Sequence, residues 1–324
     1  MLTDLQDSCN TILSHGVVAI HTETVYGLAA NALSVGAVKK IYEIKGRPHQ
    51  NPLIVHILES KNAEEISYTN DFFYSLAERF WPGPLSLILP VNDKVPRITT
   101  GGMQTVAMRS PQSNIFRDVL RKTKLPLAAP SANPSNRISP TCADHVISGF
   151  KNNCPKILDG GNCSIGIEST VLDVSGRKPV ILRPGPIGAK EIEDFLGVRI
   201  EQPSTPKREV KSPGLSPTHY SPITPTIVYE DSSALIQEIE LNPNDIFIFP
   251  FENMISCSPI GSNIIPISKT NDSTEVSKKI YSVLHAADRA IPKNIRICLL
   301  PEINGLASAL NDRIRRTGKL IFKE

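Results

Sequence analysis

Residues 37–57 read AVKKIYEIKGRPHQNPLIVHI, and they place a helix, a basic turn and a strand in direct succession. Apolar residues at helical spacing over Ala37–Ile44 predict a helix that ends near Gly46 and Pro48. The apolar run Leu53–Ile57 predicts a short strand. A helix that leads through a short turn into a strand is typical of α/β and α+β proteins.

The same alternation continues on both sides of this stretch. Helices are predicted after a capping box of Thr3 and Gln6, after an N-cap at Asn70, and at Ser139-Pro140. Further strands are predicted at Val17–Ile20, Leu85–Leu89, Thr105–Met108, Leu127–Ala129, Ser169–Val174 and Val180–Leu182. Residues 1–200 are therefore expected to form an α/β domain around a twisted, mixed sheet.

The character of the chain changes after residue 200. Residues 201–225, EQPSTPKREVKSPGLSPTHYSPITP, are dense in Pro, Ser and Thr and predict an extended linker. Residues 226–324 again alternate, which predicts a small parallel α/β domain without a GxGxxG dinucleotide motif. Its expected elements are Thr226–Tyr229, Ser233–Leu241, Ile246–Phe249, Thr274–Ala290, Ile295–Leu300 and Ala307–Arg316.

The composition excludes several classes of protein. With 40% hydrophobic and 21% charged residues, the 324-residue chain is typical of globular proteins. It has no apolar run of the ~18 residues that span a bilayer, and its first residues lack the basic region of a secretory signal. Six scattered cysteines show no metal-ligand spacing. We therefore expect a cytoplasmic protein with no membrane partner and no metal site of its own.

Four short motifs could bind a polyanion or a small polar ligand. They are Lys45–Pro52, Ala129–Ser135, Ile167–Val171 and Leu182–Gly185. Each alone also fits an ordinary turn, and the basic Lys45–Arg47 segment fits a helix C-terminus, where the macrodipole favours cations. The standard phosphate loop is missing, because the glycine-containing segment Gly161–Gly166 lacks the following Lys-Ser/Thr.

Together, in this order, the motifs resemble the threonylcarbamoyl-AMP synthase family of YrdC-like proteins over about residues 10–195. The resemblance rests on HTETVYGL (21–28), KGRPHQNPLIVH (45–56), WPGPLSLIL (81–89), TVAMRSP (105–111), APSANPSNRISPT (129–141), LDGG (158–161), ESTV (168–171) and LRPG (182–185). It includes the paired signature of that family, Lys-x-Arg followed by Ser-x-Asn. His21 stands where the family usually has proline.

The rest of the chain resembles the long form of the same family. That form has a linker containing a PG…HY.P element and a C-terminal Rossmann-like domain. Pro213-Gly214, His219–Pro222 and the closing GLASALNDRIRR (305–316) are similar to both. Residues Leu215–Thr218 depart from the family pattern.

The resemblance implies a nucleotidyltransferase reaction. Threonine, bicarbonate and ATP would give threonylcarbamoyl-AMP and pyrophosphate, with Mg²⁺ expected alongside ATP. A separate transfer complex would then place the threonylcarbamoyl group on an adenosine next to the anticodon of tRNA. Direct binding of tRNA, the role of the C-terminal domain and the oligomeric state are left open.

The resemblance also implies roles for individual residues. Lys45, Arg47, Ser131 and Asn133 match the signature and are assigned to catalysis, with the two cations neutralising phosphate charge. The residues that match nucleotide-binding positions are Arg47, Asn51, Thr105, Ser131, Ser139, Arg183 and the linker residue Tyr220, which would close the cleft against water. The residues that match threonine-binding positions are Thr24, His56, Arg109 and Ser169, with Arg109 suited to grip the carboxylate.

Two other readings stay open. A YrdC-like domain could be a double-stranded RNA or tRNA-binding module, although the chain has a net charge of only +3 and no aromatic-rich strand. It could also be a carbamoyl-transfer domain, although the acylphosphatase and zinc-finger segments of such proteins are missing here. Pyrophosphate exchange that depends on threonine and bicarbonate separates the synthase from the RNA-binding module.

Overall fold

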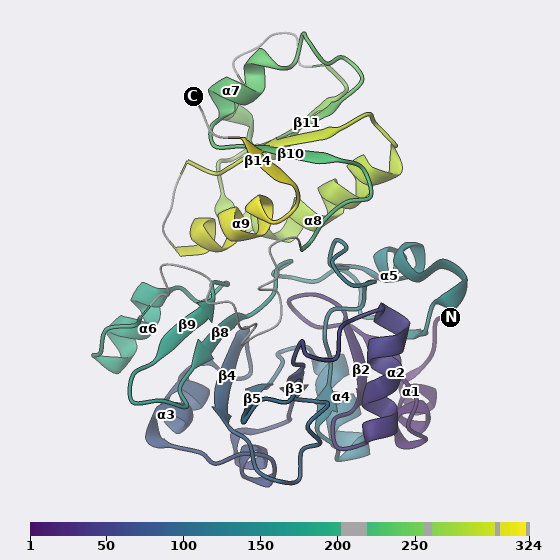
Figure 1. Cartoon of the computed structure of the whole chain (residues 1–324), viewed down its shortest axis with the longest axis vertical. Helices are drawn as coiled ribbons and strands as arrows, with labels where there is room; N and C mark the ends of the chain where they lie inside the picture. Colours follow the sequence, from purple (N-terminus) through teal and green to yellow (C-terminus); the bar gives the residue numbers. More distant parts are fainter. Residues whose placement is uncertain (202–218, 256–260, 302–304, 322–324) are drawn as a thin grey trace. The chain divides into compact units, whose positions relative to one another are not determined.

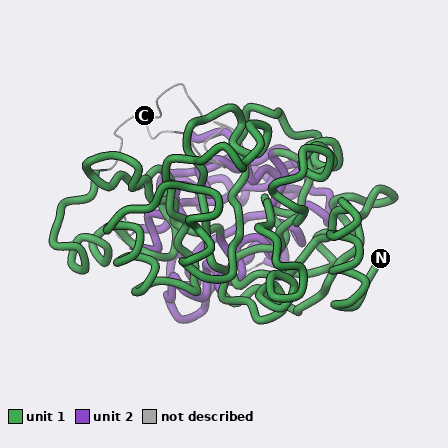
Figure 2. Tube along the Cα trace, turned by 90° about the horizontal axis from the view of Figure 1, so that it is seen from below, with its two compact units in different colours: residues 1–135, 139–164, 168–216 green, residues 136–138, 165–167, 217–324 purple. Residues whose placement is uncertain are grey.

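The computed structural model describes residues 1–201, 219–255, 261–301 and 305–321. The chain divides into two compact units, one of residues 1–135, 139–164 and 168–216, the other of residues 136–138, 165–167 and 217–324 (Figure 2). Most of the predicted linker, from residue 202 to residue 218, lies outside the described residues. Within the described ranges, every helix is too short or too polar to span a bilayer.

The N-terminal unit is built on a nine-stranded mixed sheet in the order β7-β1-β2-β6-β3-β5-β4-β8-β9 (Figure 1). Three pairs are parallel (β1 with β7, β3 with β5, β4 with β8), and the other five are antiparallel. The strands are β1 (Val18–Ile20), β2 (Gly27–Asn31), β3 (Ile54–His56), β4 (Leu85–Pro90), β5 (Thr105–Arg109), β6 (Leu127–Ala128), β7 (Lys156–Leu158), β8 (Thr170–Asp173) and β9 (Val180–Arg183). The prediction of a mixed α/β sheet is thus confirmed.

The helices of this unit begin and end at identifiable signals. Ser34 caps α2, a start that was not predicted from the sequence. Gly46 ends the helix in the left-handed region with a φ of 59°, as the sequence predicted. Asn70 caps α3 through its side chain, also as predicted. The helices are α1 (Leu5–Leu13), α2 (Val35–Lys45), α3 (Asp71–Phe80), α4 (Asn114–Thr123), α5 (Ala143–Phe150) and α6 (Ala189–Leu196).

Two predicted helix starts are wrong by a few residues. The N-cap of α1 is Asp4, whose side chain accepts from the amide of Asp7, and Thr3 instead donates its hydroxyl to the Asp7 carboxylate. Helix α5 begins at Ala143, because the hydroxyl of Ser139 is not a cap but donates to Glu168 at 2.6 Å. In both places the hydroxyl expected to cap the helix donates to a carboxylate instead.

The alternation of side chains along the strands divides the apolar residues between the two faces of the sheet. The main core occupies one face and includes Val55, Leu87 and Met108. On the other face, α1 and α4 pack over the part of the sheet that contains β1, β2 and β6. A separate small cluster lies over β3, β5, β4 and β8 and consists of Ile54, Ile88, Ala107 and Val171, with Leu182 packed against it.

The C-terminal unit has an all-parallel five-stranded sheet in the order β12-β11-β13-β10-β14. Its elements are β10 (Thr226–Tyr229), α7 (Ser232–Gln237), β11 (Ile246–Phe251), β12 (Ile264–Ser268), α8 (Ser273–Arg289), β13 (Ile295–Cys298), α9 (Gly305–Arg315) and β14 (Lys319–Ile321) (Figure 1). The parallel sheet and its helices confirm the predicted Rossmann-like fold class. Strands β12 and β14 were not predicted.

Candidate active site

Strand register gathers several of the candidate residues on one face of the N-terminal sheet. On β5, Thr105, Ala107 and Arg109 alternate onto the same face. In the parallel ladder Ile54 pairs with Ala107 and His56 with Arg109, so these neighbours share that face. It is the face of the small apolar cluster, opposite the main core.

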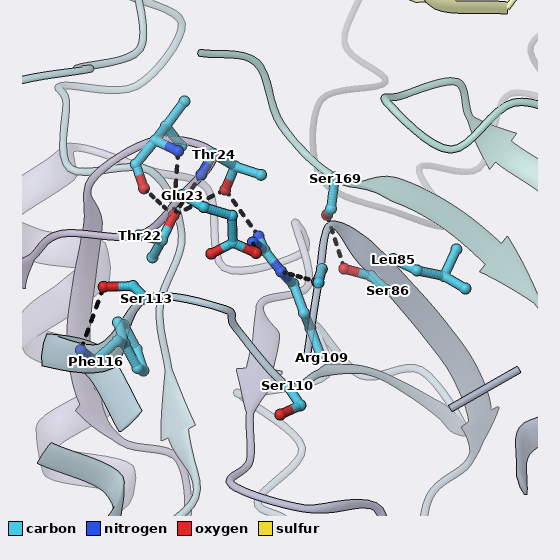
Figure 3. A network of polar contacts seen from close by, with 12 residues as sticks. Thr22, Glu23, Thr24, Leu85, Ser86, Arg109, Ser110, Ser113, Phe116 and Ser169 are labelled. Atoms are coloured by element: carbon cyan, nitrogen blue, oxygen red, sulfur yellow. Dashed lines mark hydrogen bonds and ion pairs between the residues drawn. The ribbon is translucent and has the colours of Figure 1, made fainter. Parts of the chain in front are cut away.

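The neighbouring strands extend the same face. Ile88 pairs with Ala107, and Ser86 lies two residues before Ile88 on β4. Ser86 in turn pairs with Val171, two residues after Ser169. The hydroxyl groups of Ser86 and Ser169 lie 2.8 Å apart (Figure 3). Polar groups from β3, β4 and β5, and from Ser169 just before β8, thus lie around one apolar patch.

Arg109 is a buried cation on this face, with 3% of its surface exposed. Its Nε donates to the carbonyl oxygen of Gly83 at 3.0 Å, and Nη1 donates to the hydroxyl of Thr24 at 2.8 Å. Its Nη2 makes an ion pair with Oε1 of Glu23 (Figure 3). Each Nη carries a second hydrogen, so the guanidinium keeps donors for a bidentate ligand such as a carboxylate.

A tight turn holds Thr24 against Arg109. The hydroxyl of Thr22 accepts from the amides of Thr24 and Val25, at 3.1 and 3.2 Å. It also lies 2.8 Å from the hydroxyl of Thr24. Such local hydroxyl-to-backbone bonds fix a turn, and here they fix the hydroxyl that meets the guanidinium.

Glu23 is a site residue that the sequence reasoning missed. Its side chain is buried beside Arg109, and its second oxygen, Oε2, has no hydrogen-bond partner among the described residues. Burial alone would raise the pKa of Glu23, but the charge and hydrogen bond of Arg109 hold it below its ordinary value. The only signal in the sequence was its position between Thr22 and Thr24 in HTETVYGL.

His56 is a buried, neutral imidazole. Burial, followed by the nearby Arg109 guanidinium, lowers the pKa of His56 from 6.5 to about 3. Its ring packs on Phe116 with centroids 4.9 Å apart. Nδ1 lacks a hydrogen-bond partner among the residues that the structure describes. The alternative of a core histidine with all its polar groups satisfied does not fit that nitrogen.

Arg183 and Ser169 form a second polar group at this face. Arg183 donates from Nε and Nη2 to the carbonyl oxygen of Ser169, at 3.1 and 2.9 Å, and from Nη2 to its hydroxyl at 3.1 Å. Gly185 makes this approach feasible, because a Cβ there would lie 2.3 Å from the backbone nitrogen of Thr170. The LRPG motif therefore packs directly on the ESTV motif.

The Lys-x-Arg and Ser-x-Asn segments are joined by Lys45. Its ammonium, on a side chain only 3% exposed, donates to the carbonyl oxygens of both Ser131 and Asn133. Burial, with the charge of Arg47, keeps the pKa of Lys45 well below its ordinary value. The ammonium therefore holds protein backbone in this structure.

Arg47 also contacts backbone. It donates to the carbonyl oxygens of Asn51 and Pro52, at 3.4 and 3.2 Å, and is 8% exposed. The hydroxyl of Tyr42 donates to the same Asn51 carbonyl at 2.9 Å. These contacts fold the KGRPHQNP turn onto itself and present its side chains from a fixed backbone.

Three candidate residues lie apart from the Arg109 group. Thr105 lies at the opposite end of β5 from Arg109, about 13 Å along the strand at ~3.3 Å per residue. Ser139 is fully buried and donates to Glu168. Tyr220 belongs to the C-terminal unit, where its ring stacks on Tyr281 at 5.7 Å.

The described side chains do not form a metal site of their own. Across the described ranges, no group of at least three His, Cys, Asp and Glu side chains could hold a metal ion.

Two family models match the chain in succession. Residues 10–185 match the Sua5, YciO and YrdC model, whose description is telomere recombination. Residues 187–318 match the model described as the C-terminal domain of threonylcarbamoyl-AMP synthase. Between them they cover both units of the structure.

Two similar proteins carry the name threonylcarbamoyl-AMP synthase. The threonylcarbamoyl-AMP synthase of Pyrococcus abyssi is 46% identical over 218 residues, which are 66% of this chain and 64% of that protein. The one from Bacillus subtilis is 45% identical over 228 residues, 69% of this chain and 66% of the relative. The aligned regions thus span slightly less than two thirds of each of these relatives.

Solved structures agree over a greater length. The crystal structure of Pyrococcus abyssi Sua5 complexed with L-threonine superposes with a TM-score of 0.87 and 35% identity, over 98% of this chain and 96% of that one. A full-length HypF structure matches 58% of this chain with 17% identity and a TM-score of 0.50, a likeness of fold alone. The chain belongs to the Sua5, YciO and YrdC family, in the two-domain form that carries the C-terminal domain of threonylcarbamoyl-AMP synthases.

Proposed function

We propose that this protein is an L-threonylcarbamoyladenylate synthase, a nucleotidyltransferase that converts L-threonine, bicarbonate and ATP into threonylcarbamoyl-AMP and pyrophosphate. The family, the relatives in Pyrococcus abyssi and Bacillus subtilis, and the threonine complex of the Pyrococcus protein support this activity. The observation that supports the proposal most directly is the buried guanidinium of Arg109. It donates to the hydroxyl of Thr24 and lies on the sheet face that also has His56 and Ser169.

Arg109 is suited to the carboxylate of the amino acid. The guanidinium is held on three sides by Gly83, Thr24 and Glu23, yet each Nη retains a hydrogen. A carboxylate that accepts both would be gripped by two parallel, charge-assisted bonds. The neutral His56, with its Nδ1, and Ser169 would then contact the rest of the threonine.

The remaining site residues would position the nucleotide. The amine of threonine first becomes a carbamate, and an oxygen of that carbamate attacks the α-phosphorus in line as pyrophosphate leaves. Such a reaction depends on alignment and on stabilisation of charge rather than on a protein nucleophile. We assign Arg47, Asn51, Thr105, Ser131, Ser139 and Arg183 to ATP, and Lys45 and Asn133 to the catalytic turn.

Lys45 would act partly through the backbone that it holds. Because its ammonium donates to the Ser131 and Asn133 carbonyls, it fixes the loop whose polar side chains would face the nucleotide. Although burial lowers the pKa of Lys45, a bound triphosphate would favour its protonated form, which would contribute positive charge beside the phosphates. Mg²⁺ would arrive bound to ATP, and no step is assigned to a metal site of the protein.

The last two parts of the proposal are a shielding role for Tyr220 and the transfer of the product. We place Tyr220 on bound nucleotide during turnover, where it would keep water from a mixed anhydride that hydrolyses readily. The product would pass to a cytoplasmic tRNA threonylcarbamoyl-transfer complex.

Pyrophosphate exchange tests the proposed reaction. Purified full chain should catalyse exchange of labelled pyrophosphate into ATP only when both threonine and bicarbonate are present. Exchange without threonine would contradict the synthase assignment. Absence of exchange, together with tight binding of double-stranded RNA, would favour the RNA-binding alternative.

A further inference from the structure

We propose that Glu23 is the anchor for the α-ammonium of the amino-acid substrate. Glu23 would bind the ammonium and Arg109 the carboxylate of the same zwitterion. This inference rests on the proposed function, because it concerns the threonine of that reaction. The residues assigned to threonine, which are Thr24, His56, Arg109 and Ser169, supply no anion for the amine.

The geometry supplies that anion. Glu23 is 3% exposed, and only Oε1 is engaged by the Arg109 ion pair (Figure 3). Oε2 is buried without a hydrogen-bond partner among the described residues, although the backbone of Gln112 lies near enough to help lower the pKa of the carboxyl. A buried, ionised oxygen is costly unless a donor meets it. An ammonium group is such a donor.

The chemistry of an amino acid matches the pair. Ammonium and carboxylate are attached to the same carbon, so a protein that binds both ends needs an anion and a cation side by side. Glu23 and Arg109 lie in direct contact, and both retain capacity toward a ligand: Oε2 on one, the second Nη hydrogens on the other. The hydroxyl of Thr24, which accepts from Arg109, lies beside this pair.

The structure favours Glu23 as a binding group for the substrate ammonium over Glu23 as a general base. A carboxylate whose pKa is held below its ordinary value stays ionised at neutral pH and is a weak proton acceptor. We therefore assign Glu23 to binding and positioning of the amine, not to removal of its proton. A purely structural Glu23, which only neutralises Arg109, would not distinguish ligands by their amine.

Titration calorimetry without ATP tests the anchor. The ligands are L-threonine and 2,3-dihydroxybutanoate of the same configuration, in which a hydroxyl replaces the ammonium. Wild-type full chain should bind threonine about tenfold more tightly or better. The variant Glu23→Gln should lose most of this preference, through weaker binding of threonine and little change for the hydroxy acid.

A matched control is Asp118→Asn, which removes an exposed carboxylate that pairs with Arg121 on α4. It should keep the wild-type preference. Equal weakening of both ligands in Glu23→Gln would assign Glu23 a structural role and overturn the anchor. If that variant does not fold, calorimetry of the wild type still tests the anchor. Equal binding of threonine and the hydroxy acid by the wild type would overturn the proposal.

The two proposals fail separately. A wild type that makes threonylcarbamoyl-AMP, with Glu23→Gln retaining its preference for threonine, would overturn the anchor alone. A wild type that prefers threonine through Glu23 but makes no threonylcarbamoyl-AMP would overturn the proposed function alone.

Discussion

The ammonium of Lys45, at the end of α2, donates to the backbone carbonyl of Ser131. The same ammonium reaches the carbonyl of Asn133, and the amide of Ser135 donates back to the carbonyl of Lys45 at 2.8 Å. Two segments far apart in the sequence are thus held as one structural element. The Lys-x-Arg and Ser-x-Asn signature is, in part, a description of this buried link.

The first prediction follows from the link. Replacement Lys45→Met removes a buried donor from two carbonyl groups, of which that of Ser131 keeps the amide of Asn133 at 3.0 Å. The free energy of unfolding should therefore fall by about 1–3 kcal/mol, and synthesis should largely disappear. Urea denaturation of the full chain measures the stability. Lys40→Met is the control, because Lys40 lies on the same helix and bonds one carbonyl, that of His15, at the surface. Equal stability of the two variants would contradict the link.

Arg47 should behave differently from Lys45. Its contacts to the Asn51 and Pro52 carbonyls are long, at 3.4 and 3.2 Å, so Arg47→Ala should lower the free energy of unfolding less than Lys45→Met. Loss of a charge-assisted phosphate contact should raise the ATP concentration for half-maximal synthesis about tenfold or more. Steady-state kinetics with varied ATP measures this. Unchanged turnover and unchanged ATP dependence in Arg47→Ala would remove Arg47 from the nucleotide site.

Amino-acid choice should depend on the threonine hydroxyl. A site with buried polar groups, such as Nδ1 of His56, leaves them unpaired when the substrate lacks a hydroxyl. Valine has a similar shape, and we expect threonine to be preferred over it by on the order of a hundredfold or more in kcat/KM. Product formation from each amino acid, measured separately, is the readout. Comparable use of valine would show that the side-chain contacts are misassigned.

Stability should depend on pH through His56. Its pKa is about 3 in the folded protein and 6.5 ordinarily, so below pH 6.5 the unfolded chain binds a proton that the folded protein does not. Stability from this group is therefore present above pH 6.5 and falls as the pH decreases, by about 2 kcal/mol between pH 7 and pH 5. Denaturation of wild type and His56→Phe at both pH values measures it. An identical pH dependence in the two proteins would contradict a neutral, buried His56.

The linker residue Tyr220 gives a prediction with two separable parts. Within the C-terminal unit its ring stacks on Tyr281 and lies under the guanidinium of Arg313, so Tyr220→Ala should destabilise that unit by about 3–5 kcal/mol. If Tyr220 also shields the nucleotide, the variant should hydrolyse more ATP per product formed. Cleavage between Lys207 and Lys211 should then slow when ATP and threonine are added to the wild type. Full activity in Tyr220→Ala and equal cleavage in both conditions would limit Tyr220 to packing.

The sequence predicted the elements whose signals are local. Gly46 and Asn70 mark a helix end and a helix start by backbone conformation and side-chain capping, and both are found. Strand β2 (Gly27–Asn31) was missed because its GLAAN sequence lacks β-branched residues, and its place is set by pairing with β1 and β6.

The site was predictable only in part for a similar reason. Motifs could name Arg109 and Thr24, but the contact between Glu23 and Arg109 depends on a turn and a strand that are 86 residues apart in the sequence. The assignment of Lys45 to phosphate alone was incomplete, because the carbonyl groups that it meets belong to a loop brought near by the sheet. Nothing local in the sequence indicates such contacts.

The most direct measurement is detection of threonylcarbamoyl-AMP by mass spectrometry from purified full chain incubated with ATP, Mg²⁺, L-threonine and bicarbonate. The proposed function predicts this adduct, formed together with pyrophosphate, and predicts its loss when threonine or bicarbonate is omitted. ATP turnover without the adduct, at equal rates with and without threonine, would contradict the account.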